Sequence, residues 1–450
     1  MSAPDMAARG AGRAEDGGYP SPLRAWLVIA VLLLAYTIAF VDRQILSLMV
    51  QPIRADLQLS DTAISLLHGF AFAIFYTFLG MFLGRWADRG SRKAMIAGGM
   101  VLWCLATVAC GFAQTFHQLF AARIMVGVGE ATLSPAAYSL ISDYFAPARR
   151  GRAMSAYTMG IFVGSGVALI LGGLAVTAAS QEAAVTLPLA GTVRPWQAAF
   201  MIVGIPGLAV AGLMLLVREP KRQERRKGDH PLPDMAETFA FFRARAGILF
   251  AIVTGFGVNA IISYGLSAWV PSLFIRVHHW SAGDIAFAYG VILLTSGCAG
   301  ILCGGWLADR MTTSGKPDGA LRASLLGMAA VIPVVPFVGL ASSPALALAA
   351  LAWTSFFLGV PTGIAPAALH AITPNEFRGQ VTALYLFAIN LIGMGFGPTF
   401  VALATDRVFQ SDLAVGRSLA LVTGLAAIVA FALIAAARRG YGAAVAAAHR

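Results

Sequence analysis

The feature that most constrains this chain is a series of apolar stretches, each about 20 residues long or more. A helix that crosses the hydrocarbon core of a bilayer needs roughly 20 mostly apolar residues. Twelve such stretches follow one another, at approximately 25–48, 62–84, 94–113, 118–141, 153–178, 197–217, 247–275, 285–307, 321–341, 345–369, 380–404 and 416–437. Because a β-barrel would show short alternating segments instead, they predict an all-α integral membrane protein with twelve transmembrane helices.

The charged residues agree with a membrane protein. Only 12% of the residues are charged and 58% are hydrophobic, so polar side chains are too few to coat a water-soluble globule. The formal net charge of +11 could indicate a nucleic-acid partner, so the positions of the basic residues matter. If each apolar stretch crosses the membrane once, most of the 32 Lys and Arg residues fall on the side of both chain ends. This positive-inside distribution predicts cytoplasmic termini and gives no support for nucleic-acid binding.

The two halves of the chain resemble each other. A shift of 221 residues places Gly84 on Gly305, and the word Ala-Asp-Arg at 87–89 on the same word at 308–310. We therefore expect two six-helix bundles in the same orientation, joined by a long polar run. The expected boundaries are 1–24 for a cytoplasmic tail, 25–217 for the N-terminal bundle, 218–245 for a cytoplasmic linker, 246–437 for the C-terminal bundle and 438–450 for a second tail.

Several motifs resemble one large transporter family. The segment "GRWADRGSRK" (84–93) is similar to the loop signature of the major facilitator superfamily, and "RIMVGVGEA" (123–131) resembles its fourth helix. Within that family, "FVDRQILSLMVQPIRADLQLSDT" (40–62) and "GVGEATLSPAAYSLISDYF" (127–145) look most like the spinster-type branch of lipid and sphingolipid transporters, in a bacterial member. The resemblance implies the major facilitator fold, alternating access and a multi-pass protein of the bacterial inner membrane. Helix five lacks the Gly-Pro pair of many antiporters, so symport and antiport both stay open.

Four charged residues fall well inside the predicted helices, away from the helix ends, where a charge costs at least ~2.5 kcal/mol and needs a cavity or a partner. They are Asp42 and Arg43 in the first helix, and Arg123 and Glu130 in the fourth. Arg123 and Glu130 lie about 10 Å apart along their helix, too far for a direct pair. We expect Arg123 to reach Asp42, and Glu130 to lie in an apolar, glycine-lined setting. The predicted role of Glu130, Arg123 and Asp42 is proton coupling, which the resemblance also assigns to helix four; a static network that joins the two helices is the alternative.

The predicted substrate site combines a mostly apolar cavity with a cationic group. The resemblance implies that helices 1, 4, 7 and 10 line this cavity. The candidate binding residues are Arg43, Arg123, Glu130, Asn259, Ser263 and Tyr264. Such a site suits an amphiphile of the lysophospholipid or sphingoid phosphate type, whose anionic head contacts Arg43 or Arg123. A proton-coupled importer of small organic anions is the alternative function.

The repeated Ala-Asp-Arg word predicts a latch between the bundles at their cytoplasmic ends. A carboxylate near a helix end accepts hydrogen bonds, and a glycine lets another helix approach closely. The candidate gating residues are Gly84, Asp88, Arg89, Asp143, Asp309 and Arg310. A solvated turn that only fixes the topology is the alternative.

Other classes of protein find no support in the sequence. The chain contains no G-x-x-x-x-G-K-[ST] phosphate loop and no H-E-x-x-H motif. Its four cysteines fit neither a zinc site nor a disulfide framework. We therefore expect a transporter rather than an enzyme, with no cofactor and no metal. The expected partners are a small amphiphilic substrate, protons and membrane lipids, and the expected state is a monomer.

Overall fold

The computed structural model describes residues 19–87, 90–180, 185–187, 191–220 and 235–448. Within these ranges, twelve helical segments are long and apolar enough to cross a membrane. The first six are α2 (Pro22–Leu48), α4 (Asp61–His68) with α5 (Phe70–Ala87), α6 (Arg92–Cys110), α7 (Phe116–Glu130) with α8 (Leu133–Tyr144), α9 (Pro147–Ala179) and α10 (Pro195–Leu216). The all-α fold with twelve spans is confirmed.

The other six spans lie in the second half of the chain, and two of them contain π-helical turns in the described residues. They are α12 (Ala246–Val277), α13 (Ala282–Ile292) with η1 (Leu293–Gly297) and α14 (Cys298–Thr313), α15 (Gly319–Val331) with α16 (Val335–Leu340), α17 (Pro344–Ala371), α18 (Arg378–Ala388) with η3 (Ile389–Phe396), α19 (Gly397–Leu403) and η4 (Ala404–Phe409), and α20 (Val415–Ala448). Short elements connect the spans: α3 (Val50–Leu57), the antiparallel strands β1 (Val185–Leu187) and β2 (Gly191–Val193), α11 (Met235–Ala244), and the 3-10 turns η2 (Asn375–Phe377) and η5 (Asp412–Ala414).

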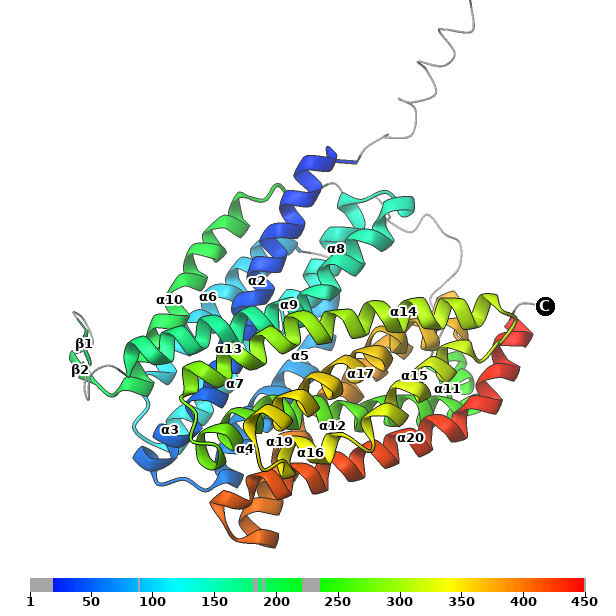
Figure 1. Cartoon of the computed structure of the whole chain (residues 1–450). Helices are drawn as coiled ribbons and strands as arrows, with labels where there is room; N and C mark the ends of the chain where they lie inside the picture. The colour runs from blue at the N-terminus through cyan, green and yellow to red at the C-terminus, as the bar shows by residue number, and fades with distance from the viewer. Residues whose placement is uncertain (1–18, 88–89, 181–184, 188–190, 221–234, 449–450) are drawn as a thin grey trace, which may run out of the picture.

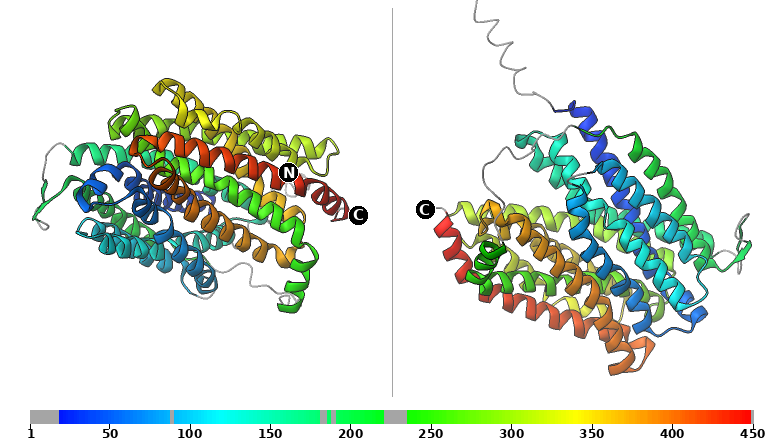
Figure 2. Two further views of the ribbon diagram at one scale, coloured as in Figure 1. Left: turned by 90° about the horizontal axis from the view of Figure 1, so that it is seen from below. Right: turned by 180° about the vertical axis from the view of Figure 1, so that it is seen from behind.

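The spans form two bundles, one from α2 to α10 and the other from α12 to α20 (Figure 1). At one end the bundles lie side by side, where α9 packs along α13 and α4 packs against α19. Toward the other end, where the chain enters α2 and leaves α20, the bundles diverge, as the view from behind in Figure 2 also shows. We call these two ends of the molecule the closed end and the open end.

The outer surface of the bundles is apolar, which explains why the spans show so little amphipathic periodicity. Leu216, Phe250 and Leu302 are 81%, 67% and 64% exposed. In water, such side chains would cost about 25 cal/mol for each Å² of apolar surface. In a bilayer this cost disappears, since lipid tails are as apolar as the side chains they meet. The exposed apolar side chains therefore mark the lipid-facing surface.

The second span is interrupted where it meets the opposite bundle. α4 ends at His68, and α5 begins at Phe70 after a single glycine. A Cβ atom at Gly69 would lie 2.5 Å from the main-chain oxygen of Met394 and 2.8 Å from that of Gly395, both in η3. Only glycine therefore allows the two backbones to approach this closely. The wide π-helical turn of η3 lies on the other side of this contact, and such turns often occur at functional sites.

Candidate functional site

An ion pair in the middle of the N-terminal bundle joins the first and fourth spans. Arg43 of α2 approaches Glu130, the last residue of α7, with 2.5 Å between Nη2 and Oε2, and Nε donates to the same oxygen at 2.7 Å. The Glu130 side chain is fully buried, whereas that of Arg43 is 17% exposed. The guanidinium also lies over aromatic rings, 4.4 Å from the Phe72 centroid and 5.2 Å from that of Tyr76. Arg43 is therefore the cation of this site that remains accessible to a ligand.

The predicted arrangement of the four charged residues is right for Arg123 and wrong for Glu130. Arg123 reaches Asp42 as expected, although its Nη1 donates to the Asp42 main-chain oxygen, at 2.9 Å, rather than to the carboxylate. Glu130 does not lie in an apolar setting, because Arg43 binds it. Neighbouring residues of a helix point about 100° apart, so Asp42 and Arg43 cannot both face Glu130. The sequence could not tell which of the two faces the fourth span.

Asp42 lies at the centre of a group of poorly satisfied buried side chains. It is fully buried, and neither carboxylate oxygen has a well-formed hydrogen bond to any residue that the structure describes. Arg123 and Thr107 are its polar neighbours. Buried charge without a partner is very costly, and binding a proton removes that charge. Asp42 is therefore a side chain on which a proton would remove an unfavourable charge, and proton coupling by Glu130, Arg123 and Asp42 stays a prediction.

The three predicted binding residues of the C-terminal bundle all lie on α12, and they differ in their surroundings. Asn259 is 5% exposed, and its Oδ1 has no hydrogen bond within the described ranges. Tyr264 is partly buried, and it packs against the apolar cluster of the N-terminal bundle that includes Phe72, the residue whose ring lies under Arg43. Ser263 is also partly buried on the same helix. Tyr264 is therefore the member of this group that the structure brings to the charged pair.

The closed end contains an ion-pair network between the bundles that sequence reasoning missed. Asp61, at the start of α4, is fully buried and accepts hydrogen bonds from Nη1 and Nη2 of Arg276 in α12, at 2.6 and 2.7 Å. Arg54 of α3 lies 3.2 Å from Asp61 and donates to both oxygens of Asp412, at 3.0 and 3.1 Å. We call Arg54, Asp61, Arg276 and Asp412 the closed-end network. The predicted topology placed few basic residues on this side of the membrane, and Arg54 and Arg276 are two of them. A basic residue is unexpected on this side, and this signal could have drawn attention to both.

Further hydrogen bonds between the bundles accompany this network. The main-chain N–H and the hydroxyl of Thr62 donate to Asp406 at 2.7 and 2.6 Å. Closer to the middle of the molecule, Ser267 of α12 donates to Gln44 of α2 at 3.0 Å. These polar contacts all lie between the closed end and the middle of the molecule. They connect the bundles in the state that the structure shows.

The predicted gating residues that the structure describes lie at the open end and do not form one cluster. Gly84 belongs to α5, whereas Asp88 and Arg89 lie outside the described residues. Asp143 pairs with Arg92, which is in the same bundle. Asp309 and Arg310 are exposed on α14, and the Arg310 guanidinium lies 5.5 Å from the centroid of the Trp306 ring. A latch between the bundles therefore remains a prediction for these residues.

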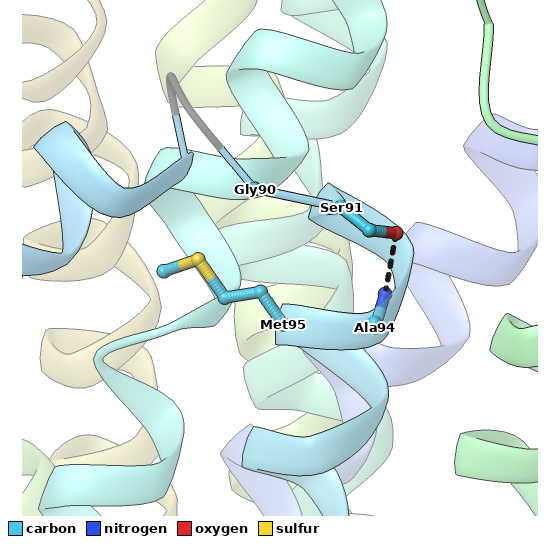
Figure 3. A pocket seen from close by; sticks show the side chains of 4 residues that line it. All are labelled: Gly90, Ser91, Ala94 and Met95. Atoms are coloured by element: carbon cyan, nitrogen blue, oxygen red, sulfur yellow. Dashed lines mark hydrogen bonds between the residues drawn. The ribbon is translucent and has the colours of Figure 1, made fainter.

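The loop signature continues into a small pocket and a well-capped helix. Gly90, Ser91, Ala94 and Met95 line the pocket, and the Ser91 hydroxyl accepts the Ala94 N–H (Figure 3). Glu219, at the end of the N-terminal bundle, also caps α6: it accepts hydrogen bonds from the Ser91 hydroxyl, the Arg92 side chain and the Lys93 N–H. Burial would raise the pKa of Glu219, but these hydrogen bonds outweigh it and lower the pKa.

Two six-helix bundles that meet at one end, with buried charges in the middle, are the architecture of a membrane transporter. Residues 32–398 match the Major Facilitator Superfamily, and the chain belongs to that family of secondary transporters. It is 31% identical to an MFS-type efflux pump of Mycolicibacterium smegmatis over 95% of both chains, and 25% identical to a hexuronate transporter of Bacillus subtilis over 89% of this chain and 93% of that one.

The solved structures agree with the family and with its predicted branch. The chain superposes with a TM-score of 0.76 on the crystal structure of a bacterial homologue of the human lysosomal transporter spinster, in an inward-facing and unoccupied conformation. The sequences are 26% identical, and the match covers 95% of this chain and 98% of the other. The predicted resemblance to the spinster-type branch is thus confirmed at the level of sequence and fold.

Proposed function

We propose that this protein is a proton-coupled transporter of an amphiphilic anion, of the lysophospholipid or sphingoid phosphate type. The ion pair between Arg43 and Glu130 is the observation that carries the proposal. A guanidinium is well suited to a phosphate or carboxylate head, and here it rests on aromatic rings that suit the apolar part of an amphiphile. The likeness to a spinster homologue supports the lipid substrate.

In the proposed mechanism, the substrate head and Glu130 compete for Arg43. While Glu130 is ionised, it holds the guanidinium and leaves it little affinity for another anion. A proton on Glu130 cancels its charge, which frees Arg43 to bind the head of the substrate. Substrate and proton therefore occupy the site together, and loss of the proton lets Glu130 displace the substrate. Arg123 and Asp42 complete the charge balance of the buried group.

Alternating access then exposes this site to each side of the membrane in turn. The open end faces the cytoplasm, as the charge distribution predicts. The protein acts as a monomer in the bacterial inner membrane. In this state the closed-end network seals the opposite side. A ligand can shift the equilibrium between the two states only as far as it binds one of them better. The substrate therefore has to contact both bundles, for which Tyr264 and Asn259 of α12 are the partners in the C-terminal bundle.

The test is Glu130→Gln, which keeps the size of the side chain but cannot change its charge. We expect the variant in proteoliposomes to bind a lysolipid at every pH and to exchange it across the membrane, yet to lose accumulation driven by a pH gradient. Glu376→Gln, at an exposed carboxylate of the open end, is the matched control and should behave like the unmodified protein. Gradient-driven accumulation by a well-folded Glu130→Gln protein would end the proton-carrier proposal.

The second candidate function is proton-coupled import of small organic anions, which the similarity to a hexuronate transporter favours. It uses the same Arg43 and Glu130 chemistry but needs no apolar contact with an acyl chain. The same proteoliposomes distinguish the two functions when lysolipids and small carboxylates are compared. Saturable transport of the small carboxylates alone would replace the lipid proposal with the import function.

A further inference from the structure

A group of hydroxyl side chains lies on the open-end side of the Arg43–Glu130 pair, and the mechanism above does not use it. Each of four spans of the N-terminal bundle contributes a tyrosine, and one of these spans also contributes a serine. We call these residues the tyrosine cluster: Tyr36 of α2, Tyr76 of α5, Ser134 and Tyr138 of α8, and Tyr157 of α9.

Contacts between the rings connect the tyrosine cluster to Arg43. Tyr36 stacks on Tyr157 with 5.1 Å between the ring centroids, and Tyr138 meets Tyr157 edge-on at 5.3 Å. The Tyr76 hydroxyl lies 3.5 Å from the Ser134 hydroxyl, and the Tyr76 ring centroid is 5.2 Å from the Arg43 guanidinium carbon. A molecule whose anionic group binds Arg43 from the open end therefore lies beside these hydroxyls.

The Tyr157 hydroxyl is the unusual group of the cluster. Its side chain is fully buried, and the hydroxyl has no well-formed hydrogen bond to any residue in the described ranges. Tyr138, Tyr76, Ser134 and Arg43 lie near it, and among them Ser134 is its weak hydrogen-bond partner. A buried hydroxyl that is poorly paired lowers stability, and phenylalanine would fill the same space without that cost. Tyr138, which is 38% exposed, and the partly buried Ser134 give a ligand access to this region.

The cluster suits a hydroxyl group of a ligand better than a cation. An ammonium group would face the charge of Arg43, and the tyrosine cluster itself contains no carboxylate to balance it. The stacked rings of Tyr36 and Tyr157 also cover each other's faces, which an ammonium group would need for a cation–π contact. Phenol and serine hydroxyls, in contrast, both donate and accept hydrogen bonds.

We propose that the tyrosine cluster is a subsite for a free hydroxyl close to the phosphate of the substrate, with Tyr157 as its principal hydrogen-bond partner. The inference rests on the proposed function, because Arg43 has to hold the phosphate. It narrows the substrate class to phosphate esters that carry a hydroxyl on the carbon next to the phosphate-bearing carbon. A site that forms such a hydrogen bond rejects an analogue without the hydroxyl, since its own buried group is then left unpaired.

The test compares two lipids that differ by one oxygen atom, 1-oleoylglycerol 3-phosphate and its 2-deoxy analogue. Their affinities are measured for the full-length protein in nanodiscs. One hydrogen bond predicts roughly three- to tenfold tighter binding of the lipid with the hydroxyl. Tyr157→Phe should bring this ratio to about one, mainly by weakening binding of the hydroxylated lipid. Tyr441→Phe, a buried tyrosine of α20 at the open end of the other bundle, is the matched control and should keep the ratio.

The outcomes separate the subsite from the proposed function. If neither lipid binds, the lipid function itself is wrong. If both bind equally to the unmodified protein, or if Tyr157→Phe keeps the ratio, the subsite is wrong. Tighter binding of the analogue that carries an ammonium group in place of this hydroxyl than of the hydroxylated lipid would also overturn it, in favour of an ammonium site. Tyr157→Phe should change Tm little, because it removes a poorly paired buried hydroxyl; if it unfolds the protein, Ser134→Ala provides the same comparison.

Discussion

The closed-end network makes a quantitative prediction about the balance between the two states of the transporter. Asp61→Asn removes the charge that faces Arg276, whose own side chain is only 5% exposed. Breaking a buried ion pair from one side costs about 3–5 kcal/mol. Arg54, the second cation beside Asp61, is partly exposed and keeps Asp412 as a partner, so only Arg276 loses its buried carboxylate. We therefore expect the sealed state to lose about 2–3 kcal/mol relative to the other state, which is roughly a 30- to 150-fold shift in their populations.

Asp412→Asn is the control within the same network. Asp412 also binds Arg54, but its side chain is 59% exposed. Exposed ion pairs contribute about 0–1 kcal/mol, so the shift should not exceed roughly fivefold. The contrast between the two aspartates therefore tests whether burial, rather than the number of hydrogen bonds, decides the strength of the seal.

The assay measures a distance between the bundles at the closed end. Spin labels at Gln114, in the loop before α7, and at Ser342, in the loop before α17, lie on exposed positions of opposite bundles. Asp61→Asn should add or enlarge a long-distance population, and Asp412→Asn should change the distribution little. Equal effects of the two substitutions, or an unchanged distribution for a folded Asp61→Asn protein, would refute the reasoning. Asp61→Glu, which restores the charge, should return most of the short-distance population.

Two further predictions concern contacts that hold this state together. Gly69→Ala should lower Tm and slow transport, because its Cβ would meet the main-chain oxygens of η3 at 2.5 and 2.8 Å. Gly98→Ala on α6, where a Cβ meets nothing within 4 Å, should leave Tm unchanged or raise it; equal losses for both would contradict the close-packing argument. Glu219→Gln should cost about 1–2 kcal/mol of stability at neutral pH, seen as a lower Tm. Since the folded-state pKa of Glu219 is lowered, its contribution is complete above the unfolded pKa of about 4.3 and is lost as the pH falls through the folded-state value; a Tm difference that persists at lower pH would contradict it.

The spans could be predicted from the sequence, whereas the partners of the charged residues could not. The length of an apolar stretch is enough to predict a span. A bilayer offers no water to an unpaired backbone group, so a stretch that crosses it has to form a helix. The identity of an ion pair depends instead on helix rotation and side-chain reach. Asp42 and Arg43 are neighbours in sequence, yet only Arg43 meets Glu130.

Asp61 was missed for a different reason. It follows Ser60, the N-cap of α4, and an acidic residue in the first turn of a helix usually faces solvent. Its burial comes from the other half of the chain, through Arg276, which is 215 residues away. The break at Gly69 was hidden in the same way, because the residues that require it belong to η3. Contacts between the bundles leave little trace in local sequence patterns.

The central pair and the closed-end network are separate clusters, and one helix connects them. The Arg43–Glu130 pair lies within the N-terminal bundle, so a proton on Glu130 does not by itself break any contact between the bundles. Gln44, the next residue of α2, accepts a hydrogen bond from Ser267 of α12. Arg54 of the closed-end network lies on α3, which continues directly from α2. In the proposed cycle, the release of Arg43 therefore acts on the closed end through α2, because this helix belongs to the proton site and to the seal at the same time.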